Sequence, residues 1–406
     1  MPLLHIGRAL RHRNFRRFFV GQLASLSGSW VQQTAQAWLV YRLTDSSLWL
    51  GLVAFVGLLP ILLLGIPAGS VADRVSRHRL LLAVHSVALV QAALLAYLTL
   101  SGQVTVFQVM LLAALLGTTQ AFEMPARQAF IADLVPRADL PNAIALNSAL
   151  FNAARFVGPA LAGVIIAVAG EGWAFALNAA SFAAIVVALL TMDGAVRAPP
   201  VPVVHAGDSF WSGLHQVRAD PLQHGVLLMV MTVSLVGLPF ALLMPVVARD
   251  LYGGDAGLLG ALLAANGAGA FVAALWLAAR AGITGQQQVI GRAALGAGVV
   301  LLLFATTPPA AVALLLLAAA GFAFTTLVAS CNTALQLRTP DRLRGRVMAL
   351  FSVLFVGLFP FGNLLAGSLA EWFGPRPVIV LFGCCCLLAG GLYLARVRGD
   401  MRVASR

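Results

Sequence analysis

The chain contains no lysine, and its 26 basic residues are all arginine. Charge of either sign is scarce, because only 10% of the 406 residues are charged, whereas soluble proteins carry about a quarter. Hydrophobic residues make up 60% of the chain. A composition so poor in charge excludes an ordinary soluble domain, since most of its surface must face lipid. The sequence therefore predicts a membrane protein.

Cysteine is scarce as well, and its spacing excludes several kinds of site. Cys331 stands alone and the other three form the run from Cys384 to Cys386, so none has the spacing of metal ligands. The seven histidines form no His-x-x-x-His or His-Glu-x-x-His pair, and no Gly-x-Ser-x-Gly elbow or Walker loop occurs. We therefore predict no metal, no cofactor and no enzymatic activity. A basic stripe interleaved with aromatic residues is also missing, so no nucleic-acid partner is expected.

Long apolar runs fill the sequence. Crossing about 30 Å of hydrocarbon takes about 20 apolar residues as a helix, whereas a spanning strand needs alternating segments of about ten residues, which are absent. We predict an all-α membrane protein with twelve transmembrane helices in two pseudo-symmetric six-helix bundles. The predicted spans are residues 18–41, 48–71, 80–100, 104–122, 142–169, 172–192, 222–248, 257–279, 289–306, 310–335, 346–370 and 376–395.

The twelve spans fall into two sets of six. Residues 1–192 form the predicted N-terminal bundle, and residues 222–406 form the predicted C-terminal bundle. Residues 193–221 hold a proline-rich run and a short amphipathic stretch, which predict a cytoplasmic linker with an interfacial helix at 210–217. The two halves also share Leu/Pro patterns ahead of helices that contain Leu-Ala-Gly. Such parallel repeats place a substrate site near the bilayer midplane, at their interface.

The positions of the arginines predict the orientation. With the N-terminus in the cytoplasm, 22 arginines lie in cytoplasmic segments, and only Arg42, Arg249 and Arg376 lie on the opposite face. Positive residues gather on the cytoplasmic side of membrane proteins, so both termini are predicted to be cytoplasmic. The exclusive use of arginine is typical of a GC-rich bacterial genome. The expected location is the bacterial inner (cytoplasmic) membrane, which the chain crosses several times.

The most informative charge cluster lies between the second and third spans. Gly69 allows a close approach to a neighbouring helix, and Asp73 can cap a helix or pair with an arginine. Arg74 and Arg77 can bind partners at the surface. The pattern resembles the signature loop between helices 2 and 3 of the major facilitator superfamily, with Ser76 where that family usually has glycine. The resemblance implies that Gly69, Asp73, Arg74 and Arg77 form a cytoplasmic gate.

Two further segments resemble one branch of that superfamily. Residues 125–136 are similar to the helix 4–5 connection of the drug-efflux branch, which includes macrolide and siderophore exporters. Residues 344–348 resemble the entry to helix 11 in the same branch. The resemblance covers essentially the whole chain and implies a rocker-switch carrier, usually an exporter driven by proton antiport. The helix 4 arginine motif of the family is missing, because residues 117–120 hold no cation.

Span 5 carries a small-residue face that predicts close helix packing. Ala154, Gly158 and Ala162 recur every four residues, and Pro159 bends the helix because it lacks an amide donor. Gly158, Pro159 and Gly163 resemble the Gly-Pro element that antiporters of the family carry on this helix. Packing alone is one interpretation, and a role in keeping the antiporter tight against proton leak is the other.

Arg155 lies in the same span, about 20 Å deep by helical rise. A charge at that depth must be paired or hydrated, because hydrocarbon does not solvate it. One interpretation is a structural ion pair. The other is a cavity arginine that binds an anionic or carbonyl-rich part of a substrate. Asn152 and Ser148 share its helical face, which favours a wet wall.

Glu123 is the candidate for proton coupling. It lies near the cytoplasmic edge of span 4, and a carboxyl group enclosed by a membrane protein suits a proton carrier. Arg127 follows four residues later, in the order that favours a helical ion pair, although Pro125 lies between them. A structural pair and a role in proton coupling are both open interpretations.

Span 1 carries a polar stripe. The steps of three and four residues put its members on one helical face, and lipid would penalise such a face, so it must line protein or water. Interhelical hydrogen bonding is one interpretation. A substrate-lining wall is the other, and the resemblance to the major facilitator superfamily implies it, because the first helix of each repeat borders the cavity in that family. The candidate cavity residues are Gln22, Ser25, Ser29, Gln32, Gln33 and Gln36, together with Asn152, Arg155, Asn266, Asn332 and Asn363.

Taken together, these features predict a secondary active exporter that moves small amphipathic molecules out of the cytoplasm by alternating access, in exchange for protons. The predicted cavity offers amides and one arginine but no deep acid cluster, so neutral or partly anionic substrates are expected. The alternative is a dedicated siderophore or lysolipid exporter of the same fold. The expected partners are the substrate, protons and membrane lipids, and the chain is expected to act as a monomer.

Overall fold

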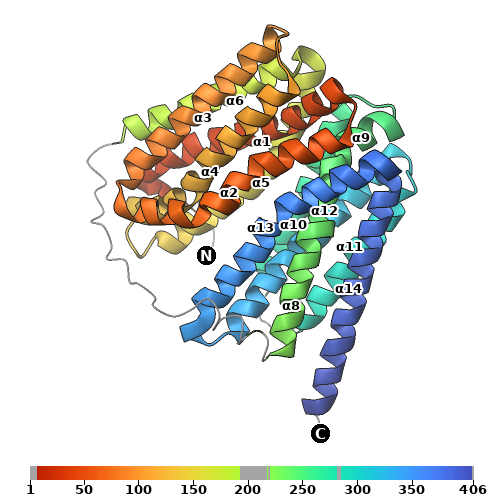
Figure 1. Ribbon diagram of the computed structural model, residues 1–406. Coiled ribbons are helices and arrows are strands. Elements are labelled where there is room, and N and C mark those ends of the chain that lie inside the picture. The colour runs from red at the N-terminus through yellow and green to blue at the C-terminus, as the bar shows by residue number, and fades with distance from the viewer. Residues whose placement is uncertain (1–6, 193–216, 218–219, 281–284, 405–406) are drawn as a thin grey trace. The chain divides into compact units, whose positions relative to one another are not determined.

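The computed structural model describes residues 7–192, 217, 220–280 and 285–404. These residues form helices and short connections, without a strand among them. Contacts divide the chain into two units, built mainly on the first six and the last six long helices, which are coloured red to yellow-green and green to blue in Figure 1. The predicted all-α fold is therefore confirmed.

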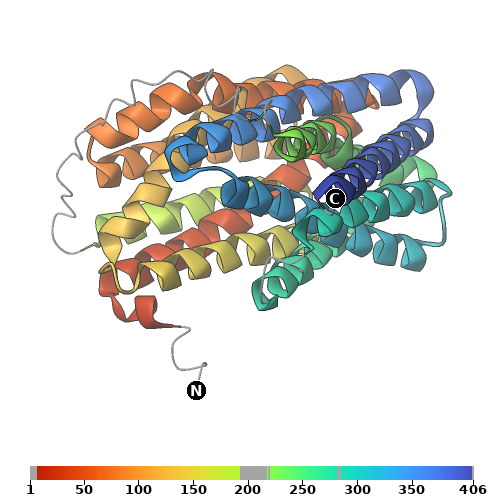
Figure 2. The ribbon, with the colours of Figure 1, turned by 90° about the horizontal axis from the view of Figure 1, so that it is seen from below.

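Unit 1 comprises residues 1–45, 56–204 and 256–260. Its long helices lie alongside one another in both ribbon views, and α6 packs against both α1 and α3 (Figures 1 and 2). The helices of the first half are η2 (Arg8–Arg11), α1 (Arg13–Thr44), α2 (Ser47–Arg74), α3 (Arg77–Leu100), α4 (Val106–Leu134), α5 (Leu140–Ala169) and α6 (Glu171–Leu190).

Unit 2 comprises residues 46–55, 205–255 and 261–406, so the beginning of α2 belongs to it. In this unit α11 packs against α14 and α12. The helices of the second half are α8 (Pro221–Thr232), η3 (Val233–Gly237), η4 (Leu238–Leu243), α9 (Met244–Val246), η5 (Val247–Leu251), α10 (Ala256–Ala279), α11 (Gln286–Ala305), α12 (Ala310–Arg338), α13 (Asp341–Phe373) and α14 (Pro375–Ala404).

The same glycine turn ends the fifth long helix of each half. Gly170 follows α5 with φ of 88°, and Gly374 follows α13 with φ of 78°. A positive φ is readily adopted by glycine, which lacks a Cβ. Because the next helix begins at the following residue, each glycine reverses the chain within a single position. The recurrence of this turn agrees with two related halves.

Eleven helical segments among the described residues are long and apolar enough to cross a membrane. The remaining long helix, α1, has 32 residues but is less apolar, because it carries the polar stripe. The segment predicted as one helix at 222–248 is a helical span from Pro221 to Leu251 that contains two π turns and a 3₁₀ turn. Pro239 and Pro245 lie inside it and lack amide donors, which accounts for the irregular hydrogen bonding.

Several helices extend beyond the predicted spans. α2 continues to Arg74 and α4 continues to Leu134, so only Val75 and Ser76 connect α2 to α3. The predictions ended where the apolar residues ended, whereas backbone hydrogen bonding continues through polar residues. The interfacial helix predicted at 210–217 lies outside the described residues, apart from Val217.

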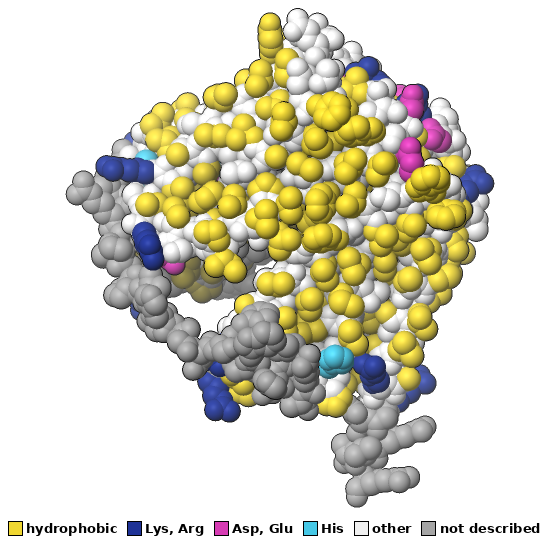
Figure 3. Space-filling view, viewed as in Figure 1, with side chains coloured by type: hydrophobic (Ala, Val, Ile, Leu, Met, Phe, Trp, Pro, Cys, Tyr) yellow, Lys and Arg dark blue, Asp and Glu magenta, His cyan; other side chains and the backbone are white. Residues whose placement is uncertain are grey.

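An apolar core fills one end of unit 1. Phe15 and Phe18 of α1 belong to it, together with Leu81 of α3 and Phe130 of α4. The rings of Phe18 and Phe130 meet edge to face, with 5.4 Å between their centroids. On the outside, hydrophobic side chains cover most of the face that Figure 3 shows on each unit. This distribution suits helices that pack together in lipid.

Candidate functional site

Glu123 lies on α4 within a group of polar side chains contributed by four helices. Its Oε1 is 2.7 Å from Nε of Arg127, one turn further along α4, so Pro125 does not prevent the ion pair. The Nε–H of Arg127 is not aligned as a hydrogen bond, although the charges are in contact. Gln22 of α1 donates from Nε2 to the same Oε1 at 3.4 Å, and Arg127 donates to Asn147 of α5 at 3.3 Å.

His85 of α3 completes this group. Its side chain is buried, and both Glu123 and Arg127 lie close enough for their charges to act on it. Its Nε2 atom has no hydrogen-bond partner among the described residues. We call Gln22, His85, Glu123, Arg127 and Asn147 the Glu123 cluster. Sequence reasoning missed His85 and Asn147; an ionisable residue inside an apolar span was the signal that could have found His85.

The predicted gate residues are only partly engaged in this structure. Arg77 donates from one nitrogen to both oxygens of Asp133 on α4, at 2.8 and 2.9 Å. Asp73 and Arg74 are exposed and form no hydrogen bond or ion pair with any described residue. A Cβ on Gly69 would meet no described atom within 4 Å. The gate assignment therefore remains a prediction.

The polar stripe of α1 divides into buried and accessible members. Gln22, Ser25 and Gln32 are almost fully buried inside unit 1. Ser29 and Gln36 are half-buried, and Gln33 is exposed. Interhelical hydrogen bonding accounts for Gln22 and Gln32, whereas the accessible members stay candidates for a substrate wall.

Gln32 belongs to a buried hydrogen-bond network across three helices. It donates to Oε1 of Gln91 on α3 at 3.2 Å and accepts from Asn178 of α6 at 2.7 Å. Ser181 donates to Oδ1 of Asn178 at 2.8 Å. Gly28 packs directly against Asn178 and Ser181, so a larger residue there would displace the network. The network fixes α1, α3 and α6 against one another through polar groups that are nearly all paired.

The small-residue face of α5 packs as its spacing predicts. A Cβ on Gly158 would lie 2.3 Å from Cβ of Trp30 on α1. Ala154 and Ala162 are buried on the same face, and Pro159 is buried beside them. Gly163 faces Gly260, where an added Cβ would be 3.0 Å from Cα of Gly260. Close packing is therefore one established role of this face.

Arg155 occupies a different face of α5. It is half-buried and forms no hydrogen bond or ion pair with any described residue. The predicted structural ion pair is thus absent from this part of the chain. Asn152 donates to the carbonyl of Ser148 one turn away, and Ser148 is exposed. Nothing links Arg155 to Glu123 among the described contacts.

The three asparagines predicted from the second half have different surroundings in unit 2. Asn266 of α10 donates to the carbonyl of Leu317 on α12 at 3.3 Å. Asn332 accepts a hydrogen bond from Gln336 on the same helix. Asn363 of α13 is buried. Asn266 and Asn332 are half-buried, so they are the more accessible of the three.

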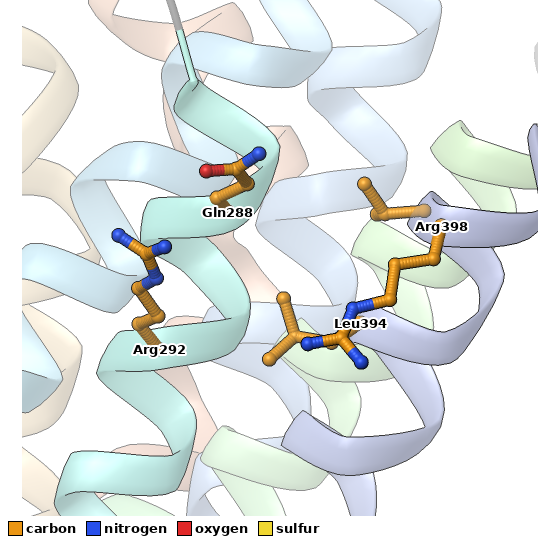
Figure 4. Close-up of a pocket in the computed structure, with 5 residues that line it drawn as sticks. Gln288, Arg292, Leu394 and Arg398 are labelled. Atoms are coloured by element: carbon orange, nitrogen blue, oxygen red, sulfur yellow. The ribbon is translucent and has the colours of Figure 1, made fainter. Parts of the chain in front are cut away.

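A small cavity of about 110 Å³ lies elsewhere in unit 2. As Figure 4 shows, its lining comes from the neighbouring helices α11 and α14, which contribute Arg292 and Arg398. Gln288, Leu394 and Val397 complete it. None of the predicted site residues lines this cavity.

Comparison with known proteins places the whole chain in one family. The family described as transmembrane secretion effector matches residues 8–403. The multidrug efflux pump Tap of Mycolicibacterium fortuitum is 27% identical over 397 residues, which cover 95% of this chain and 96% of that protein. The staphyloferrin A transporter of Staphylococcus aureus is 36% identical over 152 residues, which cover 37% of this chain and 38% of that relative.

A solved structure gives the same fold. A bacterial homologue of the human lysosomal transporter Spinster, in an inward-facing and occupied conformation, matches with a TM-score of 0.74 at 15% identity. The match covers 95% of this chain and 97% of that one. At this level of identity the likeness shows the fold alone.

Proposed function

The chain belongs to the transmembrane secretion effector family of the major facilitator superfamily, and on that premise we propose that it exports small amphipathic molecules in exchange for protons. It is a multi-pass membrane transporter and not an enzyme. Relatives named as a multidrug efflux pump and a siderophore transporter support the efflux of small molecules. The proposed location is the bacterial inner membrane with both termini in the cytoplasm, and the proposed working form is a monomer.

The observation that carries proton coupling is the position of Glu123. It lies 11 residues, or about 16 Å, from the end of α4 at Leu134, enclosed by unit 1 with 16% of its side chain exposed. An ionisable residue at such a depth is rare and usually functional. The chain holds only two other glutamates, and Glu171 and Glu371 lie at helix ends.

The contact with Arg127 gives the carboxyl group a way to act on the helices. While Glu123 is ionised, it attracts Arg127 and accepts a hydrogen bond from Gln22. Protonation removes the negative charge and leaves Arg127 without a counterion, which is costly in a poorly solvated site. Binding and release of a proton would therefore change the contacts between α4, α1 and α5, as a coupled carrier requires.

The proposed substrate wall consists of accessible polar residues rather than the whole predicted set. Arg155 and Asn152 supply a cation and an amide on α5, and Ser29, Gln33 and Gln36 supply polar groups on α1. The other predicted cavity residues are buried or hydrogen-bonded within their units, so we propose that they support the wall rather than contact the substrate. Asp73 and Arg74 are proposed to close the cytoplasmic side in another conformation.

The test is uptake into everted membrane vesicles that are acidified inside. The probes are ethidium, a neutral macrolide and staphyloferrin A, measured in the wild type, E123Q and E171Q. We expect uptake of at least one probe that collapses with an uncoupler and is lost in E123Q. E171Q is the matched control, because Glu171 also pairs with an arginine, Arg42, at 2.7 Å, but outside the Glu123 cluster. Uptake that survives both the uncoupler and E123Q would contradict proton coupling.

Arg155 has no partner among the described residues, and this favours a second candidate, export of an anionic siderophore. A half-buried guanidinium without a counterion is suited to bind carboxylate groups of a substrate. Uptake of staphyloferrin A and uptake of ethidium, each measured in R155Q vesicles and compared with the wild type, separate the two candidates. Loss of staphyloferrin A uptake with ethidium uptake retained would favour the siderophore exporter, and equal loss of both would favour the broad exporter.

A further inference from the structure

His85 is a buried titratable residue that the coupling scheme above does not use. Only 4% of its surface is exposed, and its Nε2 atom has no partner among the described residues. Buried polar atoms are nearly always hydrogen-bonded, so an unpaired ring nitrogen requires a physical reason. His85 lies eight residues, or about 12 Å, from the start of α3 at Arg77, which places it at a depth similar to that of Glu123.

The surroundings of His85 combine an apolar wall with opposite charges. α3 packs against α6 and α4. From α6, the ring of Phe182 lies 6.1 Å from the imidazole ring, centroid to centroid. From α4, the charges that act on it are the carboxylate of Glu123 and the guanidinium of Arg127. The ring is thus packed against an aromatic side chain of α6, while the opposite charges of Glu123 and Arg127 act on it from α4.

Resting on the proposed proton coupling, we propose that His85 is a second proton-binding residue of the exporter and shares the transported proton with Glu123. The proton moves from the carboxyl group of protonated Glu123 to Nε2 of neutral His85, directly after a side-chain rotation or through one water molecule. The O–H bond breaks, the N–H bond forms, and the products are a carboxylate and an imidazolium. The site holds the same number of protons before and after.

The free oxygen of Glu123 makes this transfer chemically reasonable. Oε1 of Glu123 forms the ion pair with Arg127 and accepts the hydrogen bond from Gln22, whereas Oε2 forms no hydrogen bond with a described residue. With the proton on Glu123, Arg127 loses its counterion. With the proton on His85, the carboxylate is restored and attracts both cations. The second site therefore lets the proton stay in the cluster while the Glu123–Arg127 pair re-forms.

The burial pattern sets the order of the two steps. The apolar core around Phe18, Leu81 and Phe130 fills the bundle between His85 and the nearby ends of α1, α3 and α4. The side chain of Glu123 is 16% exposed, whereas His85 is 4% exposed. Water therefore reaches Glu123 more readily. In the proposed order Glu123 exchanges protons with water, and His85 receives its proton from Glu123.

The first test follows the histidine rings themselves. The full chain, labelled with ¹⁵N-histidine and held in phosphatidylglycerol nanodiscs, is titrated from about pH 5 to pH 8, where histidine ordinarily changes charge. The His85 signal is assigned by its loss in H85Q or, should that variant not fold, in H85N. We expect His85 to titrate and its midpoint to shift in E123Q. His78 is the internal control, because its Nε2 contacts the carbonyl of Leu189 and it lies beside Phe130.

The second test separates this proposal from the proposed function. Everted vesicles that are acidified inside, as in the test of the proposed function, are assayed with ethidium and staphyloferrin A across the same pH range for the wild type, H85Q, H78Q and E123Q. We expect H85Q to keep probe exchange without a gradient but to lose the pH dependence of driven uptake, while H78Q behaves as the wild type. A His85 ring that never titrates, or H85Q with the wild-type pH profile, overturns the role of His85. Unchanged coupling in E123Q instead overturns the proposed function.

Discussion

The contact between α5 and α1 at Gly158 gives a sharp prediction about packing. A Cβ built on Gly158 lies 2.3 Å from Cβ of Trp30, 3.3 Å from the carbonyl oxygen of Ser27 and 3.4 Å from the carbonyl carbon of Trp30. Non-bonded carbon atoms are comfortable at about 3.5–4.0 Å, so the first distance is short by more than about 1 Å. The Cβ of Trp30 is fixed to its backbone and cannot rotate away. G158A must therefore push the two helices apart.

The expected cost follows from that separation. Overpacking of a close-packed interior typically costs about 1–3 kcal/mol, while alanine is favoured over glycine within a helix by about 1 kcal/mol. Because the Cβ–Cβ contact is short by more than about 1 Å, the upper part of the overpacking range applies, and we expect G158A to lower the free energy of unfolding by up to about 2 kcal/mol on balance. The neighbouring contacts of Ala154 and Ala162 with their surroundings would loosen at the same time.

The matched control is G65A on α2, where an added Cβ meets no described atom within 4 Å. Reversible unfolding in mixed detergent and SDS, followed by tryptophan fluorescence, would compare both variants with the wild type. We expect G65A to be neutral or slightly stabilised and G158A to be destabilised. Equal stability of G158A and G65A would refute the steric reasoning. A transport defect in G158A without any loss of stability would instead favour the leak-prevention role of this element.

Three further predictions concern side chains with contrasting environments. N178A should destabilise the protein by about 1–3 kcal/mol in the same unfolding assay, because it leaves the buried Oε1 of Gln32 without its donor. D73N should lower transport turnover in vesicles while leaving the unfolding curve unchanged, since Asp73 is exposed and forms no hydrogen bond or ion pair with a described residue; a shifted curve would count against a purely conformational role. The hydrogen bond with His12 holds the pKa of the Asp139 carboxyl group below its usual value, although burial acts in the opposite direction. This hydrogen bond therefore stabilises the fold above about pH 4, and the stabilisation is lost as pH falls through the lowered folded pKa of Asp139. The protection factors of the amides of residues 8–12, measured against the intrinsic exchange rate at each pH, should therefore fall on acidification in the wild type, whereas D139N should show low protection at every pH; acid-insensitive protection in the wild type would contradict this.

The fold could be predicted because lipid imposes a strong rule on the sequence. Apolar runs of about 20 residues identify spanning helices, and Gly158 with its alanine neighbours identifies a packing face. The details that failed concern backbone hydrogen bonding rather than hydropathy. The helix that ends at Arg74 and the irregular span around Pro239 show that polar residues extend helices and internal prolines distort them. Hydropathy carries no information on either effect.

The site was less predictable because partners come from other helices. The pair of Glu123 with Arg127 was visible, since both residues lie one turn apart on α4. His85 was not, because its relation to Glu123 depends on how α3 packs against α4. The stripe on α1 had the correct face but two interpretations, and only the positions of Gln91 and Asn178 distinguish a buried network from a substrate wall.

Arg155 offers a final prediction in which stability and function move in opposite directions. It lies 15 residues, or about 22 Å, along α5, half-buried and without a partner among the described residues. Insertion scales put the cost of an arginine at a helix centre at about 2.5–3.5 kcal/mol, and partial hydration reduces it. R155M should therefore stabilise the protein by about 1 kcal/mol or more, whereas R127M, which removes the partner of Glu123, should destabilise it. Both variants would be unfolded in detergent and SDS and tested for staphyloferrin A uptake. If R155M proved less stable than the wild type, Arg155 would have to bind a group within the protein, and its assignment to substrate binding would fail.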